Sequence, residues 1–315
     1  EFIAGAPMPM MGLAAVAVAP PRRRRGIGAR LCVDAIERAA GRGDVISVLY
    51  PFRPDYYGRL GWGLVGALHE YRFHTRSLAA GAGDGVRTAD LERDAGAIAA
   101  CYARVAEGSN GPIERDRQVW AYRLTGEELG VVPVDAEAVW TARSEAQDRA
   151  VVYDDGAITG YALLRYVRRA SPEDHTLQVR ELVAEDEAAY GGLLGHIAGQ
   201  SDQWPRCLHY ARPDERFGDF LTDPRPPRFR GARSLYFPTA RIVRGPMLRV
   251  LDLPGALRAR RFFAAGGEGA ATLGVSVQDA QRPANDGPWT VRLEHGSAAV
   301  EPGEPSSPDA VLETD

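Results

Sequence analysis

Four consecutive arginines precede two closely spaced glycines near the start of the chain. The arginines are residues 22–25, and Gly26 and Gly28 follow them directly. Guanidinium groups bind phosphate oxygens in bidentate pairs, and glycines let a phosphate approach the backbone closely. A helix that begins here would add unpaired N–H groups and a partial positive charge. The pattern therefore predicts a binding site for a diphosphate group.

The neighbouring segments place this loop between a strand and a helix. Residues 13–19 are apolar and bounded by prolines, which predicts a buried strand. Residues 26–40 carry apolar side chains at helical spacing, and Gly41 and Gly43 mark the end of that helix. A second strand is expected at residues 45–49. The diphosphate site would then lie at the N-terminus of the helix.

Other phosphate-binding motifs fit the segment less well. A Gly-x-Gly-x-x-Gly dinucleotide motif would need glycine where Leu31 stands, and a P-loop would need a lysine, which the chain lacks entirely. A plain basic surface patch is the simplest alternative for a run of arginines. The apolar segment before the arginines and the amphipathic helix after them favour the diphosphate site.

Composition indicates an ordinary globular chain. Of its 315 residues, 45% are hydrophobic and 25% charged, with a net charge of −4. These values argue against wholesale disorder and against a general attraction to nucleic acids or membranes. The three cysteines lack the spacing of a zinc site or disulfide framework, so we expect no metal and a reducing, cytoplasmic location. The apolar stretch at 8–21 has neither the order of a signal peptide nor the length of a membrane span.

The chain divides into three blocks, which predict a mixed α+β fold. The second block is expected to repeat the order of helices and strands in the first, with a hairpin turn at Asp154-Asp155-Gly156. The third follows a proline-rich connector and predicts a helix, three strands and a loop-like end after Val300. We expect domains at 1–83, 84–222 and 223–315.

Two motifs resemble a known enzyme family. Arg23-x-x-Gly26-x-Gly28 after an apolar strand resembles the acetyl-CoA signature of the GCN5-related N-acetyltransferases (GNAT family). The segment Tyr57–Gly63 resembles a motif of the enhanced intracellular survival (Eis) acetyltransferases of that family. The resemblance implies tandem GNAT-like domains with mixed central sheets, followed by a sterol-carrier-like α+β domain. On this basis the chain looks truncated at both ends.

The resemblance also implies roles for individual residues. The backbone of the segment before the arginines would pair with the pantetheine arm of acetyl-CoA, and the Arg/Gly loop would hold its diphosphate. The residues assigned in this way to acetyl-CoA are Val16, Ala17, Val18, Arg23, Arg24, Arg25, Gly26, Ile27, Gly28, Ala29, Phe52 and Arg53.

The resemblance makes Tyr57 the general acid. Its phenol, with an ordinary pKa of about 10, is protonated at neutral pH and can protonate a departing thiolate, whose conjugate pKa is about 8.5 if it behaves like cysteine. The alternative for Tyr57 is a core aromatic residue that packs on the helix.

The acceptor side of the chain departs from the family. Phe52 and Arg53 stand where the resembled enzymes carry Ser-Glu, so an aromatic and a basic side chain replace a small and an acidic one beside the acceptor pocket. The family uses a terminal carboxylate as general base, a role we do not assign to Asp315 because the last domain looks incomplete. In the second block, residues 185–187 are acidic where the Arg/Gly signature would stand, so no cofactor is expected there.

The resemblance implies an acetyl-CoA-dependent N-acetyltransferase that transfers acetyl directly to a primary amine, such as an aminoglycoside-, polyamine- or lysine-like acceptor. It also implies a homo-oligomer, often a hexamer, without nucleic-acid or membrane partners. One alternative is a protein that binds acyl-CoA or lipid without transfer, which the residues at 52 and 53 favour. Another is a scaffold whose arginine run binds an acidic protein surface. Thiol release from acetyl-CoA and a CoA-induced rise in melting temperature distinguish the three.

Overall fold

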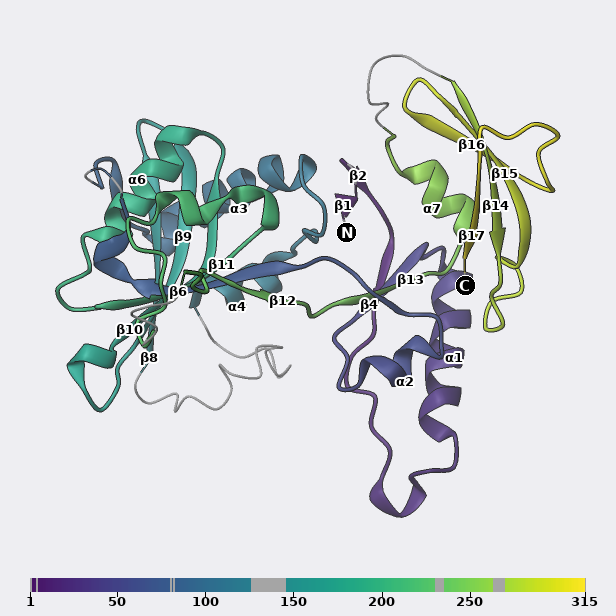
Figure 1. Ribbon diagram of the computed structural model, residues 1–315, viewed down its shortest axis with the longest axis horizontal. Helices are drawn as coiled ribbons and strands as arrows, with labels where there is room; N and C mark the ends of the chain where they lie inside the picture. The colour runs from purple at the N-terminus through teal and green to yellow at the C-terminus, as the bar shows by residue number, and fades with distance from the viewer. Residues whose placement is uncertain are drawn as a thin grey trace. The chain divides into compact units, whose positions relative to one another are not determined.

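The chain forms two compact units, each assembled from segments that are distant in sequence (Figure 1). The first unit comprises Glu1–Gly66, Ala106–Glu114 and Arg244–Asp315, and the second comprises Ala67–Val105 and Arg115–Val243. The computed structural model describes residues 2–3, 5–79, 81, 83–125, 146–229, 235–262 and 270–314.

A small mixed sheet with two helices lies at the centre of the first unit. The strand order is β3-β4-β13-β5; β3 runs parallel to β4, and β13 runs antiparallel to β4 and β5. A two-stranded antiparallel sheet, β1-β2, precedes it. The bounds are β1 Phe2–Ile3, β2 Ala6–Pro7, β3 Met10–Gly12, β4 Ile46–Leu49, β5 Gly63–Leu64, β13 Met247–Val250, α1 Ile27–Arg42 and α2 Pro54–Gly58.

Helix α1 connects the two parallel strands, and its buried face repeats at helical spacing. Cys32, Ile36 and Ala39 are fully buried and pack in one cluster with residues of β4, α2 and β13. The helix ends at Gly43, whose φ of 91° suits glycine and whose N–H reaches the carbonyls of Ala39 and Ala40. The sequence prediction of a helix at 26–40 is confirmed.

The predicted buried strand at residues 13–19 is wrong. The paired strand is β3, and after Leu13, whose N–H donates to the Val48 carbonyl at 2.9 Å, the chain leaves the sheet. Ala15 has a φ of 56°, which breaks the extended path. The side chains of residues 14–19 are half-buried or exposed, because this apolar segment borders a pocket instead of joining the sheet.

A second mixed sheet in the first unit is formed by the C-terminal part of the chain. Its order is β16-β15-β14-β17, with β17 parallel to β14. Strand β17 and the last two residues of β16 lie after Val300, where the sequence predicted a loop; pairing with β14 and β15 makes these residues strands. The bounds are α7 Leu253–Ala259, β14 Ala271–Val277, β15 Gly287–Glu294, β16 Ser297–Pro302 and β17 Ala310–Thr314.

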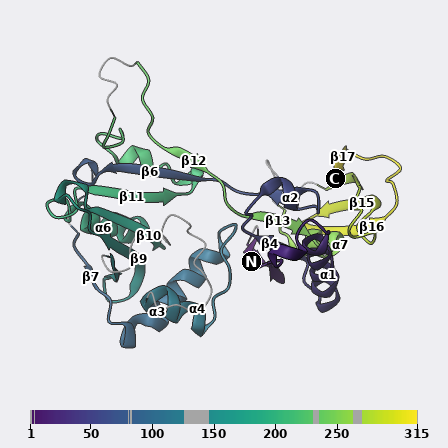
Figure 2. The ribbon, with the colours of Figure 1, turned by 90° about the horizontal axis from the view of Figure 1, so that it is seen from below.

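The second unit is built on a seven-stranded mixed sheet in the order β12-β6-β11-β10-β9-β8-β7. Figure 2 shows β6 beside β11, with which it pairs antiparallel. Most of α3 and the whole of α4 and α6 belong to this unit. The bounds are β6 Leu68–His74, β7 Val86–Thr88, α3 Leu91–Glu107, α4 Arg117–Thr125, β8 Ala146–Asp154, β9 Ile158–Val167, β10 Thr176–Ala184, α6 Glu187–Ala198, β11 Arg206–Ala211 and β12 Arg241–Val243.

The two units do not follow the predicted boundaries at residues 83 and 222. Strand β6, expected in the first domain, pairs in the sheet of the second unit, and β13, expected in the third domain, pairs with β4. The difference arises because strand pairing joins segments that are far apart in the chain. In the described part of the chain, no helix combines the length and apolar character needed to cross a bilayer.

Candidate functional site

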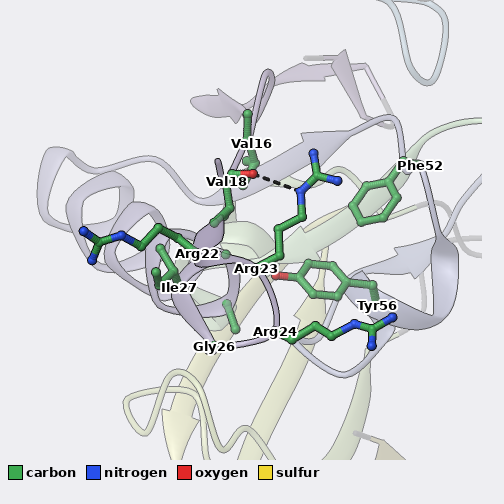
Figure 3. A pocket seen from close by; sticks show the side chains of 12 residues that line it. Val16, Val18, Arg22, Arg23, Arg24, Gly26, Ile27, Phe52 and Tyr56 are labelled. Carbon is green, nitrogen blue, oxygen red and sulfur yellow. Dashed lines mark hydrogen bonds between the residues drawn. The ribbon is translucent and has the colours of Figure 1, made fainter. Parts of the chain in front are cut away.

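A pocket of ≈ 580 Å³ lies beside the N-terminus of α1. The unpaired segment after β3 contributes one part of its lining, the arginine loop and first turn of α1 another, and two aromatic residues after β4 a third (Figure 3). The lining residues are Val16, Ala17, Val18, Arg22, Arg23, Arg24, Gly26, Ile27, Gly28, Ala29, Phe52 and Tyr56. The pocket thus lies at the arginine loop and helix N-terminus singled out in the sequence, and the segment before them lines it without joining the sheet.

The arginine loop has a backbone shape suited to binding an anion. Residues Arg24 and Gly26 both have positive φ, 60° and 72°. Consecutive amides in such a turn can form a concave donor set, and the first turn of α1 adds N–H groups without intrahelical partners. The left-handed conformation at Arg24 costs an ordinary residue about 1 kcal/mol. Strain of this kind is concentrated at binding sites.

The three lining arginines have different arrangements. The Nε of Arg23 donates to the Val18 carbonyl at 3.1 Å, which ties the arginine loop to the segment before it. In Figure 3 the side chain of Arg22 extends away from the aromatic residues, whereas Arg24 extends beneath Tyr56. All three are exposed, so their charges are available to a phosphorylated ligand.

Ten of the twelve residues predicted to hold acetyl-CoA line this pocket. Arg25 and Arg53 are not among the lining residues. Arg25 is exposed, and Arg53 forms an ion pair with Asp55, its Nε donating to Oδ1 at 3.0 Å. That pair directs the Arg53 guanidinium toward the start of α2.

Two lining residues, Arg22 and Tyr56, are not among the residues assigned to acetyl-CoA from the sequence. Arg22 belongs to the same arginine run, so the run as a whole was the available signal. Tyr56 directly precedes the predicted acid, and the sequence offered no basis for choosing between adjacent tyrosines except the family resemblance. The structure places the Tyr56 ring in the pocket lining, its hydroxyl pointing toward the arginine loop (Figure 3).

The hydroxyl of Tyr56 lies against the first turn of α1. A Cβ added to Gly28 would lie only 2.6 Å from this oxygen. The absence of a side chain at position 28 therefore leaves room for the Tyr56 hydroxyl in the site. Burial raises the pKa of the Tyr56 phenol, and the electrostatic interaction with the neighbouring Cys32 raises it further.

Tyr57 lies in the core behind the pocket lining. It is 6% exposed, and its ring makes edge contacts with Phe52, Tyr56 and Trp62 at centroid distances of 5.6, 5.1 and 6.1 Å. Burial raises the pKa of its phenol, and Cys32 and Tyr56 add to this shift. Tyr57 itself is not among the lining residues, but two of its three ring partners, Phe52 and Tyr56, line the pocket.

Similarity to known proteins agrees with this geometry. Two family models, each described as an acetyltransferase (GNAT) domain, match the chain, one at residues 2–65 and the other at residues 111–250. A structure of a GCN5-related N-acetyltransferase from Anabaena variabilis superposes with a TM-score of 0.78 at 20% identity, covering 99% of this chain and 72% of the other. The chain belongs to the GNAT acetyltransferase family and carries the fold of tandem GNAT domains.

Within this family the chain is related to the Eis proteins. It is 27% identical over 278 residues to N-acetyltransferase Eis of Mycobacterium tuberculosis, covering 85% of this chain and 62% of that protein. An uncharacterised N-acetyltransferase of Streptomyces avermitilis is 26% identical over 88% of this chain and 63% of its own length. The structure of Eis1 from Mycobacterium abscessus has a TM-score of 0.71 at 22% identity, covering 98% of this chain and 71% of that one. The chain thus spans less than two thirds of the length of these curated relatives.

Proposed function

We propose that this chain carries the donor site of an N-acetyltransferase that moves acetyl directly from acetyl-CoA to a primary amine. The observation that carries the proposal is the pocket itself. It combines exposed arginines, a helix N-terminus and an unpaired apolar segment in one cavity. A phosphorylated ligand with a long, amide-containing arm has the matching chemistry.

Each part of the pocket has a proposed binding role. The backbone of residues 16–18 pairs with the pantetheine arm as an added strand would, and Val16, Ala17 and Val18 contact its methylene groups. Arg23, Arg24 and the first turn of α1, including Ile27 and Ala29, hold the diphosphate. Phe52 packs beside the arm, while Arg25 and Arg53 act from the margin of the site.

Tyr57 is the proposed general acid. Acetyl-CoA supplies the thioester, whose carbonyl carbon bonds to the amine nitrogen as the carbon–sulfur bond breaks. The Tyr57 phenol gives its proton to the departing sulfur, the amine nitrogen releases one proton to solvent as the amide forms, and the phenolate regains a proton from solvent. Because burial raises the phenol's pKa, Tyr57 stays in the proton-donating form at neutral pH.

The wider assignments rest on resemblance to the Eis proteins. We include in the proposal an acceptor that resembles an aminoglycoside, a polyamine or lysine. We also include a cytoplasmic location and a homo-oligomer. The C-terminal sheet with α7 is proposed to be a sterol-carrier-like domain. The acidic residues 185–187 support a second GNAT-like unit that binds no acetyl-CoA of its own. Among the described residues, no group of three or more His, Cys, Asp or Glu side chains is arranged to hold a metal ion.

Replacement of Tyr57 tests the proposed chemistry. With amine panels and acetyl-CoA, Tyr57→Phe should lower the rate of thiol release on the order of 100-fold while leaving CoA affinity nearly unchanged. Tyr166→Phe is the matched control, since Tyr166 is also buried and packs edge-on against a tryptophan, Trp204, in the second unit. An unchanged rate for Tyr57→Phe, with loss for Tyr56→Phe, would transfer the acid role to Tyr56.

A second candidate function is binding of acyl-CoA or lipid without transfer. The supporting observation is Phe52, which is 68% exposed and lines the pocket as an apolar surface. Calorimetric CoA binding by the wild-type chain, with no thiol release on any amine, would favour this alternative. Absence of CoA binding would refute both the transferase and an acyl-CoA-binding function.

A further inference from the structure

A buried arginine from the C-terminal part of the chain contacts the turn that follows Tyr57. Arg249 in β13 is 3% exposed. Its Nη1 donates to the Leu60 carbonyl at 2.7 Å, and its guanidinium carbon lies 5.8 Å from the centre of the Trp62 ring. A buried charge with this orientation fixes the backbone that it contacts, since moving the carbonyl away would leave a donor unpaired.

The turn held by Arg249 is the same turn that holds the Tyr57 backbone. The amides of Leu60 and Trp62 both donate to the Tyr57 carbonyl, at 2.9 and 3.2 Å. Leu60 therefore connects Arg249 to Tyr57, with its carbonyl bound to one residue and its amide to the other. A shift of the guanidinium would be transmitted to the end of α2 through two hydrogen bonds.

Gly61 shows that this turn is shaped around the guanidinium. Its φ is +86°, and a Cβ added there would lie 1.5 Å from Nη1 of Arg249. No side chain can occupy that position while Arg249 is in place. Gly61 is one of three glycines in the Tyr57–Gly63 motif. The guanidinium of Arg249 explains why this position has no side chain.

The other side of Arg249 is fixed by a carboxylate on a separate loop. Its Nη2 binds Asp279 Oδ1 at 2.6 Å. The same carboxylate accepts the amides of Gln281 and Arg282 at 3.1 and 2.9 Å, and Asn285 Nδ2 at 3.2 Å. Asp279 is therefore held by its own loop between β14 and β15. Arg249 in turn is held between that loop and the Leu60 turn that follows α2.

We propose that Arg249, with Asp279 as its anchor, is a positioning residue that sets the place of Tyr57 in the donor site. The inference rests on the proposed function, because it concerns the residue assigned there as general acid. Arg249 itself does not line the pocket; it acts through the Leu60 turn. The loop between β14 and β15 thereby becomes a determinant of the rate of acetyl transfer.

The kinetic test compares Arg249→Met with Arg282→Met. Arg282 is the matched control, because it also donates to a backbone carbonyl, that of Leu251 at 3.2 Å, and contacts Asp279 through its amide. In the full chain, Arg249→Met should lower kcat roughly 10- to 100-fold and leave KM for acetyl-CoA within about twofold. Arg282→Met should retain wild-type kcat. Equal losses in both variants, or an unchanged kcat in Arg249→Met, would overturn the inference.

Amide hydrogen exchange gives a readout that does not need turnover. In Arg249→Met, peptides covering residues 57–63 should exchange faster than in wild type, while peptides of the second unit remain unchanged. Unchanged exchange at 57–63 overturns the inference even if the wild-type chain acetylates no amine. Faster exchange together with a wild-type chain that lacks thiol release supports the structural link and refutes the proposed function instead.

A second variant covers failure of Arg249→Met to fold. Asp279→Asn keeps the shape of the anchor and removes its charge. Its kcat should fall less than that of Arg249→Met, and its KM for acetyl-CoA should stay unchanged. Peptides covering residues 57–63 should again exchange faster than in the wild type. Wild-type kcat and wild-type exchange in Asp279→Asn would exclude Asp279 as the anchor and overturn the proposal.

Discussion

At the scale of single residues, the site is defined by close contacts that leave little room for substitution. The Tyr56 hydroxyl approaches the α1 backbone at Gly28, and the Arg249 guanidinium fills the position beside Gly61. Both glycines belong to motifs that the sequence made recognisable. The structure adds the side chain that requires each of them, and neither partner could be inferred from the motif alone.

The contact between Gly28 and Tyr56 leads to a testable prediction. Gly28→Ala should weaken CoA binding, because the new methyl forces the Tyr56 ring or the first helical turn to move; we expect about a tenfold loss, or ~1.4 kcal/mol. Removing the hydroxyl in a Gly28→Ala/Tyr56→Phe double variant leaves the nearest ring carbon 3.7 Å away, an ordinary contact, and should restore most of the affinity. Calorimetric titration with CoA measures both effects.

A control on the same helix separates this clash from a general effect of alanine. Gly41 lies in α1, and an added Cβ there has no neighbour within 4 Å. Gly41→Ala should stabilise the helix slightly, by up to about 1 kcal/mol, and leave CoA affinity unchanged. A Gly28→Ala variant with unchanged affinity would refute the steric explanation.

At the scale of elements, local patterns predicted a helix and a hairpin turn correctly, whereas they did not predict which strands pair. The helix at 26–40 and the hairpin between β8 and β9 follow from residue spacing and a turn signal, and the structure confirms both. Strands β16 and β17 were missed because proline-rich sequence hides them, and only pairing with β15 and β14 makes them strands.

The candidate site was predicted more completely than the fold that carries it. Its loop and helix are contiguous in sequence, so composition and the family resemblance located ten lining residues. Whether residues 13–19 pair with a neighbouring strand depends on distant contacts, which residue patterns do not contain. The same reason explains why Arg249 could not be connected to Tyr57 before the structure.

In the second unit, an ion-pair cluster joins three elements and gives the fold a pH dependence. Arg87 of β7 donates to Asp94 of α3 at 2.6 Å and to Asp154 of β8 at 2.6 Å. Hydrogen bonds from Arg87 and Arg93 hold the pKa of the buried Asp94 carboxyl well below its ordinary value. A carboxyl with a lowered folded-state pKa stabilises the fold above its unfolded pKa, and this contribution is lost as pH falls toward the folded value.

Replacing Asp94 should therefore remove stability at neutral pH and flatten the acid response. We expect Asp94→Asn to lower the free energy of unfolding by about 2 kcal/mol at pH 7, with the difference from wild type shrinking below about pH 4. Urea denaturation at several pH values measures this. Asp34→Asn, which removes an exposed pair with Arg38 on α1, is the control and should change little. If the difference in free energy of unfolding between Asp94→Asn and the wild type stays constant from pH 7 into the acid range, the stabilising role assigned to the Asp94 carboxylate is wrong.

At the scale of the whole molecule, neither unit is a continuous stretch of chain. The first unit needs β13, whose Met247 packs in the same core as Cys32 and Tyr57. The site at α1 thus depends on residues that the sequence assigned to another domain. The loop and helix of the site are contiguous and were recognisable in the sequence, whereas the interleaving of segments is visible only in the structure.

A truncation tests this dependence directly. A chain that ends at residue 243 lacks β13, Arg249 and the loop that anchors it, so the first unit should lose its fold and its CoA-induced rise in melting temperature. Differential scanning fluorimetry with and without CoA measures the loss against the 315-residue chain. A truncated protein that still shows the CoA-induced rise would show that β13 is dispensable for the site.

The late position of β13 also has a consequence during synthesis on the ribosome. Strand β4 leaves the exit tunnel long before its antiparallel neighbour, and at about 5–20 residues per second the delay is on the order of tens of seconds. Throughout that interval the nascent chain presents an open hydrogen-bonding edge and an uncovered apolar surface. A chaperone that covers this edge and surface until the closing strand has emerged would therefore favour productive folding in the cell.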